Sequence, residues 1–177
     1  MATEPVEEAI TAMNIQAETK HGGEGMHVFD EMPGHLIRCS RQIAVAIFLD
    51  EMAVFDVTAV QYATLAAARA NPGMDQRALG DLIAVDRSTI GTLLGRLEHR
   101  GLVTRKTPKD NQRIKRVYLT DKAYELLNES ADAIERVQQR IIAPLTKSEQ
   151  ATFMALLSKL VAGNNELSRA PLKQTRN

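Results

Sequence analysis

The chain has 177 residues, of which 44% are apolar and 4% aromatic, so it can form one domain with extensions, or one domain plus an oligomerisation element, around an aliphatic core. No apolar run is long enough for a membrane span, because Asp50 and Glu51 interrupt the longest one. The acidic first residues lack the basic and apolar regions of a signal peptide, and the single cysteine, Cys39, excludes an intramolecular disulfide and a cysteine-rich zinc site. These features predict a cytoplasmic protein without a membrane partner.

Charge is distributed unevenly along this neutral chain. Residues 1–31 contain seven acidic residues and one basic residue, whereas residues 86–122 contain ten basic residues against four acidic ones. A run of charge is usually a solvated face, so its meaning depends on the structure that displays it. The basic residues of the second segment are Arg87, Arg96, Arg100, Arg105, Lys106, Lys109, Arg113, Lys115, Arg116 and Lys122.

The first part of the chain predicts an acidic extension and then a helix. Residues 1–32 have a weak helical pattern that is interrupted at "HGGEG", so we expect an extension that is only partly helical. The segment 33–56 predicts a helix that begins at Pro33 and runs to about Ala53. Its apolar residues at helical spacing are Leu36, Ile43 and Ile47.

Residues 57–122 predict three helices and a hairpin. Thr58 and Gln61 have the spacing of a capping box and begin the first helix, which "NPG" ends, and Asp75 caps a short second helix. In the third helix, apolar residues at i, i+3, i+4 and i+7 form a buried stripe, and small or polar residues form the opposite face. The stripe is Ile90, Leu93, Leu94 and Leu97; the opposite face is Ser88, Thr92, Gly95 and His99, flanked by Gly91 and Arg96.

Gly101 terminates the third helix, and two β runs follow it. These runs, "LVTRK" and "KRVYL", are joined by the basic loop "TPKDNQRI". A short helix, a tight turn, a second helix and a hairpin are the elements of a winged helix–turn–helix. The predicted fold is mainly α with a small β-hairpin wing, in which residues 57–122 form the winged helix–turn–helix lobe.

The C-terminal part predicts two further helices and a tail. One helix begins at Thr120 and is expected to run without interruption to Pro144, and the capping box in "TKSE" opens the last helix. Residues 123–163 contain most of both helices. The polar tail, residues 164–177, is expected to be disordered.

The outward face of the third helix has the chemistry of a DNA contact. Glycine lets the helix backbone approach another surface closely, and hydroxyls near the helix start can bond phosphates or base edges. The hairpin carries further cations on its tip and strands, so helix and wing display the basic segment together, which predicts binding to double-stranded DNA. The predicted contacts are Arg87, Ser88, Thr89, Gly91, Thr92 and Arg96 on the helix and Arg105, Lys106, Lys109, Arg113 and Lys115 on the wing.

These motifs resemble the MarR family of bacterial transcription factors. The resemblance extends over about residues 33–163, and its most specific parts are "LEHRGLVTR" and "RVYLT". It implies an obligate homodimer on a pseudo-palindromic DNA operator, with repression the usual activity. It also implies that the helices of 33–56 and 123–163 form the dimer interface.

The resemblance further implies that Arg113 enters the minor groove from the wing tip and is supported by an acidic residue. The family usually places this acid two residues before the arginine, whereas Asp110 lies three residues before it. Asp110 or Asn111 therefore supports Arg113, and a plain turn role for Asp110 is an equal alternative.

Family members often respond to small aromatic acids that bind between the dimer helices and the DNA-binding lobe. The resemblance thus implies a small aromatic carboxylate as effector, with a nicotinate-like acid as the first choice. Candidate ligand residues are His35, Arg38 and Arg41 on the first helix and Tyr62 on the second, because arginine binds a carboxylate with two parallel hydrogen bonds and tyrosine stacks on a ring. The alternative is that the arginines are exposed or bridge subunits.

Cys39 offers a different sensor, since some relatives detect peroxides with one cysteine on the first helix. A reactive thiol needs cationic neighbours, which Arg38 and His35 supply, but an inert, small apolar role is the alternative.

Two other classes of function fit the sequence less well. An enzyme is not expected, because the four histidines are scattered, no metal-ligand or nucleophile motif is present, and no glycine loop for a phosphate cofactor follows a strand. No cofactor is expected for the same reasons. A winged helix used only for protein contacts has little need of positive charge on both the helix and the wing.

Overall fold

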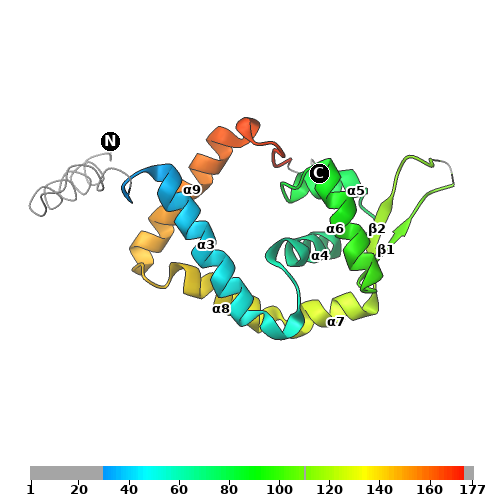
Figure 1. Ribbon diagram of the computed structural model, residues 1–177, viewed down its shortest axis with the longest axis horizontal. Helices are drawn as coiled ribbons and strands as arrows, with labels where there is room; N and C mark the ends of the chain where they lie inside the picture. The colour runs from blue at the N-terminus through cyan, green and yellow to red at the C-terminus, as the bar shows by residue number, and fades with distance from the viewer. Residues whose placement is uncertain (1–29, 110, 174–177) are drawn as a thin grey trace, which may run out of the picture. The chain divides into compact units, whose positions relative to one another are not determined.

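The computed structural model describes residues 30–109 and 111–173 and divides into two compact units, residues 1–41 and 42–177. The partly helical pattern expected before residue 30 lies outside the described residues. Figure 1 shows the elements, which are α3 (Pro33–Glu51), η1 (Ala53–Phe55), α4 (Ala59–Ala70), α5 (Gln76–Leu82), α6 (Arg87–His99), β1 (Val103–Lys106), β2 (Arg116–Leu119), α7 (Asp121–Glu129), α8 (Ala131–Ile142), α9 (Lys147–Asn164) and η2 (Asn165–Leu167).

Helices α4 and α5 begin at the predicted caps, and α6 begins at a cap, Asp86, that was not predicted. The Thr58 hydroxyl accepts the Gln61 N–H at 3.3 Å, and the Gln61 side chain accepts the Thr58 N–H at 2.9 Å, which confirms the capping box. The carboxylates of Asp75 and Asp86 accept the first backbone N–H groups of α5 and α6. Such caps satisfy donors that a helix cannot satisfy internally.

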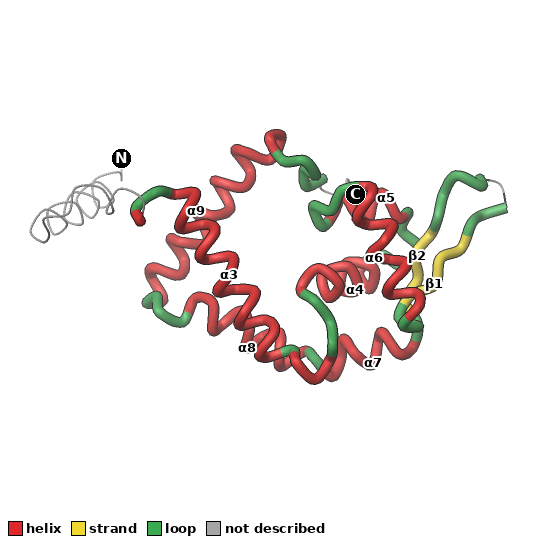
Figure 2. The backbone as a smooth tube through the Cα atoms, viewed as in Figure 1, coloured by secondary structure: helices red, strands yellow, loops and turns green. Residues whose placement is uncertain are grey.

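The buried stripe of α6 is confirmed and lies at the centre of the winged helix–turn–helix lobe. Helices α4, α5 and α6 lie close to the two strands, as Figure 2 shows, and their buried side chains form one core. Its buried members come from every one of these elements and from α7, so the lobe has a single aliphatic core. They are Leu65, Ala68, Leu79, Ile90, Leu93, Leu94, Leu97, Leu102, Val103, Val117, Ala123 and Leu127.

The wing, which we define as residues 103–119, is an antiparallel hairpin with Val103 opposite Leu119. The segment before α5 adds backbone bonds to its second strand. The Gly73 N–H donates to the Val117 carbonyl at 2.9 Å, and the Val117 N–H donates to the Met74 carbonyl at 3.0 Å. These bonds join the wing to the helix–turn–helix.

Gly101 terminates α6 in a Schellman turn. The Gly101 N–H donates to the Glu98 carbonyl and the Leu102 N–H donates to the Leu97 carbonyl, both at 2.9 Å. Gly101 has a φ of +70°, a conformation that costs residues with a Cβ about 1–2 kcal/mol. Since Leu97 and Leu102 are both buried, the turn joins α6 to the wing with three residues.

The uninterrupted helix expected from Thr120 to Pro144 is wrong, because Ser130 divides it into α7 and α8. Ser130 is fully buried and has φ −87° and ψ 0°, and its hydroxyl donates to the Leu126 carbonyl at 2.6 Å. A serine hydroxyl that binds a carbonyl one turn back bends a helix. The break lets Leu127 pack in the lobe core while Val137 packs in a second cluster with Phe48.

Within the second unit, the end of α3 is joined to α8 by ion pairs. The Glu51 carboxylate accepts the Arg136 Nε–H and the Arg140 Nη1–H, each at 2.7 Å. These guanidinium groups hold the pKa of Glu51 below its usual value, through the hydrogen bond from Arg136 first and that from Arg140 second. The contacts add to the packing of Phe48, Met52 and Val137.

The described part of the tail, residues 164–173, differs from the disordered segment expected from residue 164. Residues 165–167 form η2, and the Asn165 side chain bonds both the N–H (2.8 Å) and the carbonyl (3.0 Å) of Leu172. The Lys173 N–H then donates to the Asp81 carbonyl at 3.1 Å. The Asn165 side chain, by bonding the backbone of Leu172, gives this polar segment a local structure.

We expect Gly101→Ala to destabilise the protein by about 1–2 kcal/mol and Gly163→Ala to stabilise it by up to about 1 kcal/mol. A Cβ would meet nothing within 4 Å at either position, so only the backbone conformation differs. Urea unfolding of both variants at one protein concentration measures this difference. Shifts of the same sign would contradict the explanation.

Candidate nucleic-acid interface

The outward surface of α6, which we call the reading face, consists of Ser88, Thr92, Gly95 and His99, flanked by Gly91 and Arg96. Burial of the stripe opposite fixes this orientation, and every non-glycine side chain of the reading face is exposed. Thr92 and Arg96 project from the middle of the helix, where side chains can reach base edges in a major groove.

The hydroxyls at the start of α6 are already bonded within the protein. Ser88 Oγ donates to one Asp86 carboxylate oxygen at 2.5 Å, and Thr89 Oγ1 donates to the other at 2.8 Å. The Ser88 hydroxyl, followed by the Thr89 N–H, holds the pKa of Asp86 far below its usual value. The hydroxyls of Ser88 and Thr89 can therefore donate to a DNA phosphate only if their hydrogen bonds to Asp86 break.

Gly91 has a role that packing within the chain does not explain. A Cβ there would meet only the Gln76 amide nitrogen, at 3.7 Å, an ordinary contact. Alanine would therefore fit and would favour the helix by about 1 kcal/mol. A glycine on the outside of this helix is what close approach of an external surface requires.

The wing displays cations beyond the lobe. Lys109, Arg113 and Lys115 are exposed, and none of them forms an ion pair within the described residues. Asn111 accepts the backbone N–H of Arg113 at 3.1 Å, so it stabilises the turn rather than the guanidinium. Asp110, the other residue expected to support Arg113, lies outside the described residues.

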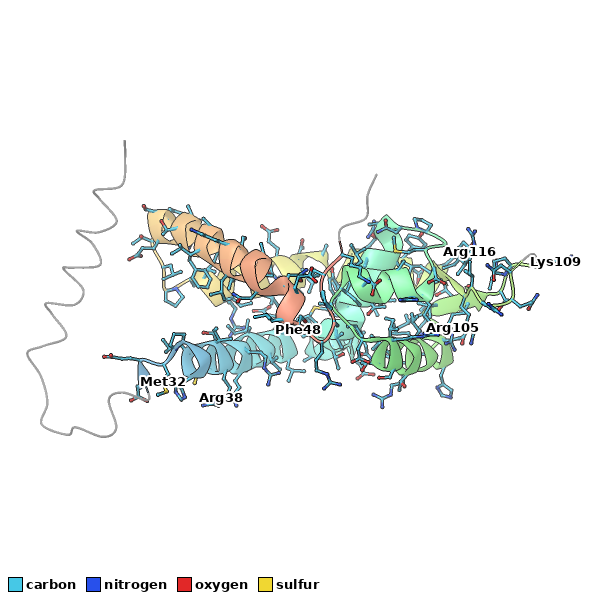
Figure 3. All side chains as sticks on the ribbon, turned by 90° about the horizontal axis from the view of Figure 1, so that it is seen from above. Met32, Arg38, Phe48, Arg105, Lys109 and Arg116 are labelled. Carbon is cyan, nitrogen blue, oxygen red and sulfur yellow. The ribbon has the colours of Figure 1, made fainter. Side chains whose placement is uncertain are left out.

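Arg105 differs from the other wing cations because Glu98 binds it. Its Nη2 lies 2.6 Å and its Nε 3.0 Å from one Glu98 oxygen, and its backbone N–H donates to the other at 3.1 Å. The Arg105 hydrogen bond is the largest cause that holds the pKa of Glu98 below its usual value. Figure 3 shows Arg105 beside α6, whereas Lys109 lies at the outer end of the wing. Lys106 is also engaged, since its ammonium lies 5.2 Å from the Tyr118 ring centroid.

The candidate sensor residues of the first unit form a small cluster on α3. His35 Nδ1 lies 3.2 Å from Arg38 Nη2, and Cys39 Sγ lies 3.3 Å from His35 Nε2 and 3.6 Å from Arg38 Nη2. Arg41 is exposed on the same helix. Tyr62 belongs to the second unit, where its ring packs edge-on against Phe48 with the centroids 6.4 Å apart.

An open groove of about 710 Å³ follows the reading face where η1 and the start of α4 approach α6. Sequence reasoning missed it, and Tyr62 is not among its lining residues. Arg100 is paired there with Asp56 at 3.2 Å, whereas Arg96 has no ion pair within the described part of the chain. The groove is lined by Thr92, Gly95, Arg96, His99 and Arg100 of α6 and by Leu49, Met52, Ala53, Asp56, Val57, Thr58 and Gln61.

The profile of the MarR family matches residues 57–115, the lobe that carries the reading face and most of the wing. A putative transcriptional regulatory protein for the hcr operon of Thauera aromatica is 30% identical over 150 residues, which are 85% of this chain and 88% of the relative. The chain belongs to the MarR family. The transcriptional repressor NicR of Pseudomonas putida is 29% identical over 131 residues, covering 74% of this chain and 83% of that protein.

Solved MarR-family structures have the same fold. The PcaV regulator of Streptomyces coelicolor in complex with its natural ligand is 30% identical with a TM-score of 0.69, covering 81% of this chain and 98% of PcaV. BpsR of Bordetella bronchiseptica, whose DNA binding is regulated by 6-hydroxynicotinic acid, is 28% identical with a TM-score of 0.70. The match covers 75% of this chain and 94% of BpsR.

Family membership assigns the general function: the protein is a DNA-binding transcriptional regulator and not an enzyme. The winged helix–turn–helix expected from the sequence is confirmed by the fold and by these relatives. Among the described helices, none is both long and apolar enough to cross a membrane.

We expect Lys109→Ala and Arg105→Ala to affect this regulator differently. Lys109→Ala should lower the slope of log affinity for DNA against log salt concentration by about 0.9, as expected when one phosphate contact is lost. Arg105→Ala should lower the melting temperature and leave that slope close to the wild-type value, because Glu98 already neutralises the guanidinium. DNA titrations at several salt concentrations and thermal melts measure both effects. A flattened slope in Arg105→Ala without loss of stability would instead identify Arg105 as a direct DNA contact.

Proposed function

We propose that this regulator is a homodimeric repressor that a small aromatic carboxylate releases from a pseudo-palindromic operator. The observation that carries the proposal is the position of the groove, because Thr92, Gly95 and Arg96 belong both to it and to the reading face. A ligand held there occupies part of the surface that DNA must approach. Binding of ligand and binding of operator then oppose one another.

An exposed apolar surface supports the homodimer. Helix α9 has no buried residue, although large apolar side chains occupy much of its length. An exposed apolar patch of this kind marks an interaction site. A two-fold dimer would also present two reading faces, which fits half-sites roughly 10 bp apart. The side chains, between 39% and 60% exposed, are Phe153, Met154, Leu156, Leu157, Leu160 and Val161.

The groove has the chemistry that a small aromatic acid requires. Leu49 and Ala53, both exposed, supply apolar contact for a ring, and Arg96 supplies a guanidinium without an ion-pair partner in the described chain. Arginine binds carboxylates with two parallel hydrogen bonds. The regulation of BpsR by 6-hydroxynicotinic acid and the repressor name of NicR support a nicotinate-like acid and repression.

A peroxide response through Cys39 is the second candidate. Its thiol sulfur lies within 3.6 Å of both His35 Nε2 and Arg38 Nη2, and cationic neighbours favour the reactive thiolate. This candidate requires oxidation of Cys39 to release DNA, whereas the carboxylate candidate does not involve the thiol.

We expect the wild-type protein to sediment as a dimer and Leu156→Asp to shift it to the monomer at micromolar concentration. A carboxylate on the apolar face of α9 would be buried without a partner in a dimer. Leu167→Asp is the matched control, because Leu167 is 84% exposed and lies beyond α9. A wild-type protein that is monomeric, or a Leu156→Asp variant that remains dimeric, would refute the proposed interface.

We expect nicotinate or 6-hydroxynicotinate to weaken operator binding about 5- to 150-fold without dissociating the dimer, the usual range of allosteric coupling. Reciprocity requires saturating operator to weaken acid binding by the same factor. Fluorescence anisotropy with labelled operator and calorimetry with the acid measure the two sides. Cyclohexanecarboxylate, which has the charge without the aromatic ring, is the control ligand.

Three variants separate the possible sensor sites. Gln61→Ala changes the groove without removing a charge, and it should weaken the acid response with operator affinity retained. Because this variant also loses the capping-box bond to the Thr58 N–H, its melting temperature is measured as well. Arg38→Ala tests the arginine predicted from the sequence, and Cys39→Ser tests the thiol. If no aromatic acid acts and Cys39→Ser abolishes a response to peroxide, the carboxylate proposal is wrong.

A further inference from the structure

A second pocket, separate from the groove, lies at the base of the wing and has a volume of about 430 Å³. Three segments that are distant in sequence form it: the start of α5, the start of α6 and the part of the wing that leads into β2. Four basic side chains line it, against the single carboxylate of Asp75. They are Arg77, Arg87, Arg113 and Lys115.

No acidic side chain neutralises these cations by direct contact. None of the four forms an ion pair in residues 30–109 and 111–173, and Lys115 has only a longer-range attraction to Glu98. The Asp75 carboxylate caps α5, where it accepts the N–H groups of Arg77 at 2.9 Å and Ala78 at 3.4 Å. The pocket therefore holds an excess of positive charge that the protein itself does not balance.

The walls of this pocket are held in place by the fold. The Gln76 N–H donates to the Lys115 carbonyl at 2.8 Å, and Asp75 pairs with Arg116 in an isolated antiparallel bridge. Ile90, a buried member of the lobe core, contributes an apolar wall, and Ile114 contributes another. Arg77 and Arg87 sit on the first turns of two capped helices, so the positions of their backbones are fixed.

We propose that this pocket binds a phosphate group. Several guanidinium groups around one concave site match the charge and the oxygen geometry of phosphate, and the apolar walls fit a sugar attached to it. The group comes either from the backbone of the bound duplex or from a free phosphorylated ligand that competes with the duplex. If the phosphate belongs to the bound duplex, the inference rests on the DNA-binding function of the protein. If it belongs to a free ligand, the inference is independent of that function.

Arg77 distinguishes this site from the reading face and from the wing tip. It is exposed on α5, outside the recognition helix and the wing, and no sequence motif distinguishes it from other surface arginines. Arg69 of α4 is the matched control, since it is also exposed and lies near the Tyr124 ring rather than in this pocket.

The test compares wild type, Arg77→Ala and Arg69→Ala in two arms. In the first arm, DNA affinity is measured against salt concentration on operator and on unrelated duplex. A duplex phosphate in the pocket predicts that Arg77→Ala lowers the salt slope by about 0.9 on both duplexes, with no change in Arg69→Ala. In the second arm, calorimetry measures pyrophosphate binding to the DNA-free dimer at constant ionic strength. A free phosphate ligand predicts pyrophosphate binding that Arg77→Ala abolishes.

Melting temperatures of the three proteins should agree, because both arginines are exposed, and Arg77→Gln provides a second variant if Arg77→Ala is unstable. The proposal is overturned if Arg77→Ala matches Arg69→Ala in both arms. Loss of all operator binding by the wild type would count against the regulator function alone, since the pyrophosphate arm does not use DNA.

Discussion

Burial of the aliphatic stripe of α6 is the constraint on which the interface depends. Ile90, Leu93, Leu94 and Leu97 enter the lobe core, and this burial rotates the helix so that its small and polar side chains face outward. Burial of each aliphatic side chain stabilises the folded lobe by about 1.5–3 kcal/mol. The four buried side chains together therefore fix the rotation of the helix, whatever residues occupy its polar face. The outward residues are therefore free to be selected for contacts with other molecules rather than for stability, which explains a glycine at position 91 inside a helix.

The same core separates the cations of the protein into two groups. Arg100 and Arg105 lie at the junction of α6 with neighbouring segments and are paired with Asp56 and Glu98. Lys109, Arg113 and other cations farther out have no such partners within the described residues. Since DNA affinity depends on cations that neutralise phosphates, the unpaired group is the one that can bind it. A count of basic residues along the chain cannot separate these groups, because pairing depends on which side chains meet in three dimensions.

Local features of the fold could be predicted from the sequence, and features that depend on distant contacts could not. The caps at Thr58, Asp75 and Thr146 and the stripe of α6 involve residues within one or two turns of each other. The break at Ser130 was missed because it depends on burial between two clusters, and a serine in a helical pattern gives no sign of that. The groove combines segments more than thirty residues apart, and the capture of Arg105 by Glu98 depends on the turn at Gly101.

The double use of Thr92, Gly95 and Arg96, as part of the reading face and as part of the groove, limits how such a regulator can evolve. Under the proposed function, a substitution at any of them would alter operator preference and effector selectivity in one step. A duplicated copy that acquired a new inducer through these positions would also drift away from the parental operator. Each of the two regulators would then bind its own operator and respond to its own inducer, without separate selection against binding to the other's operator.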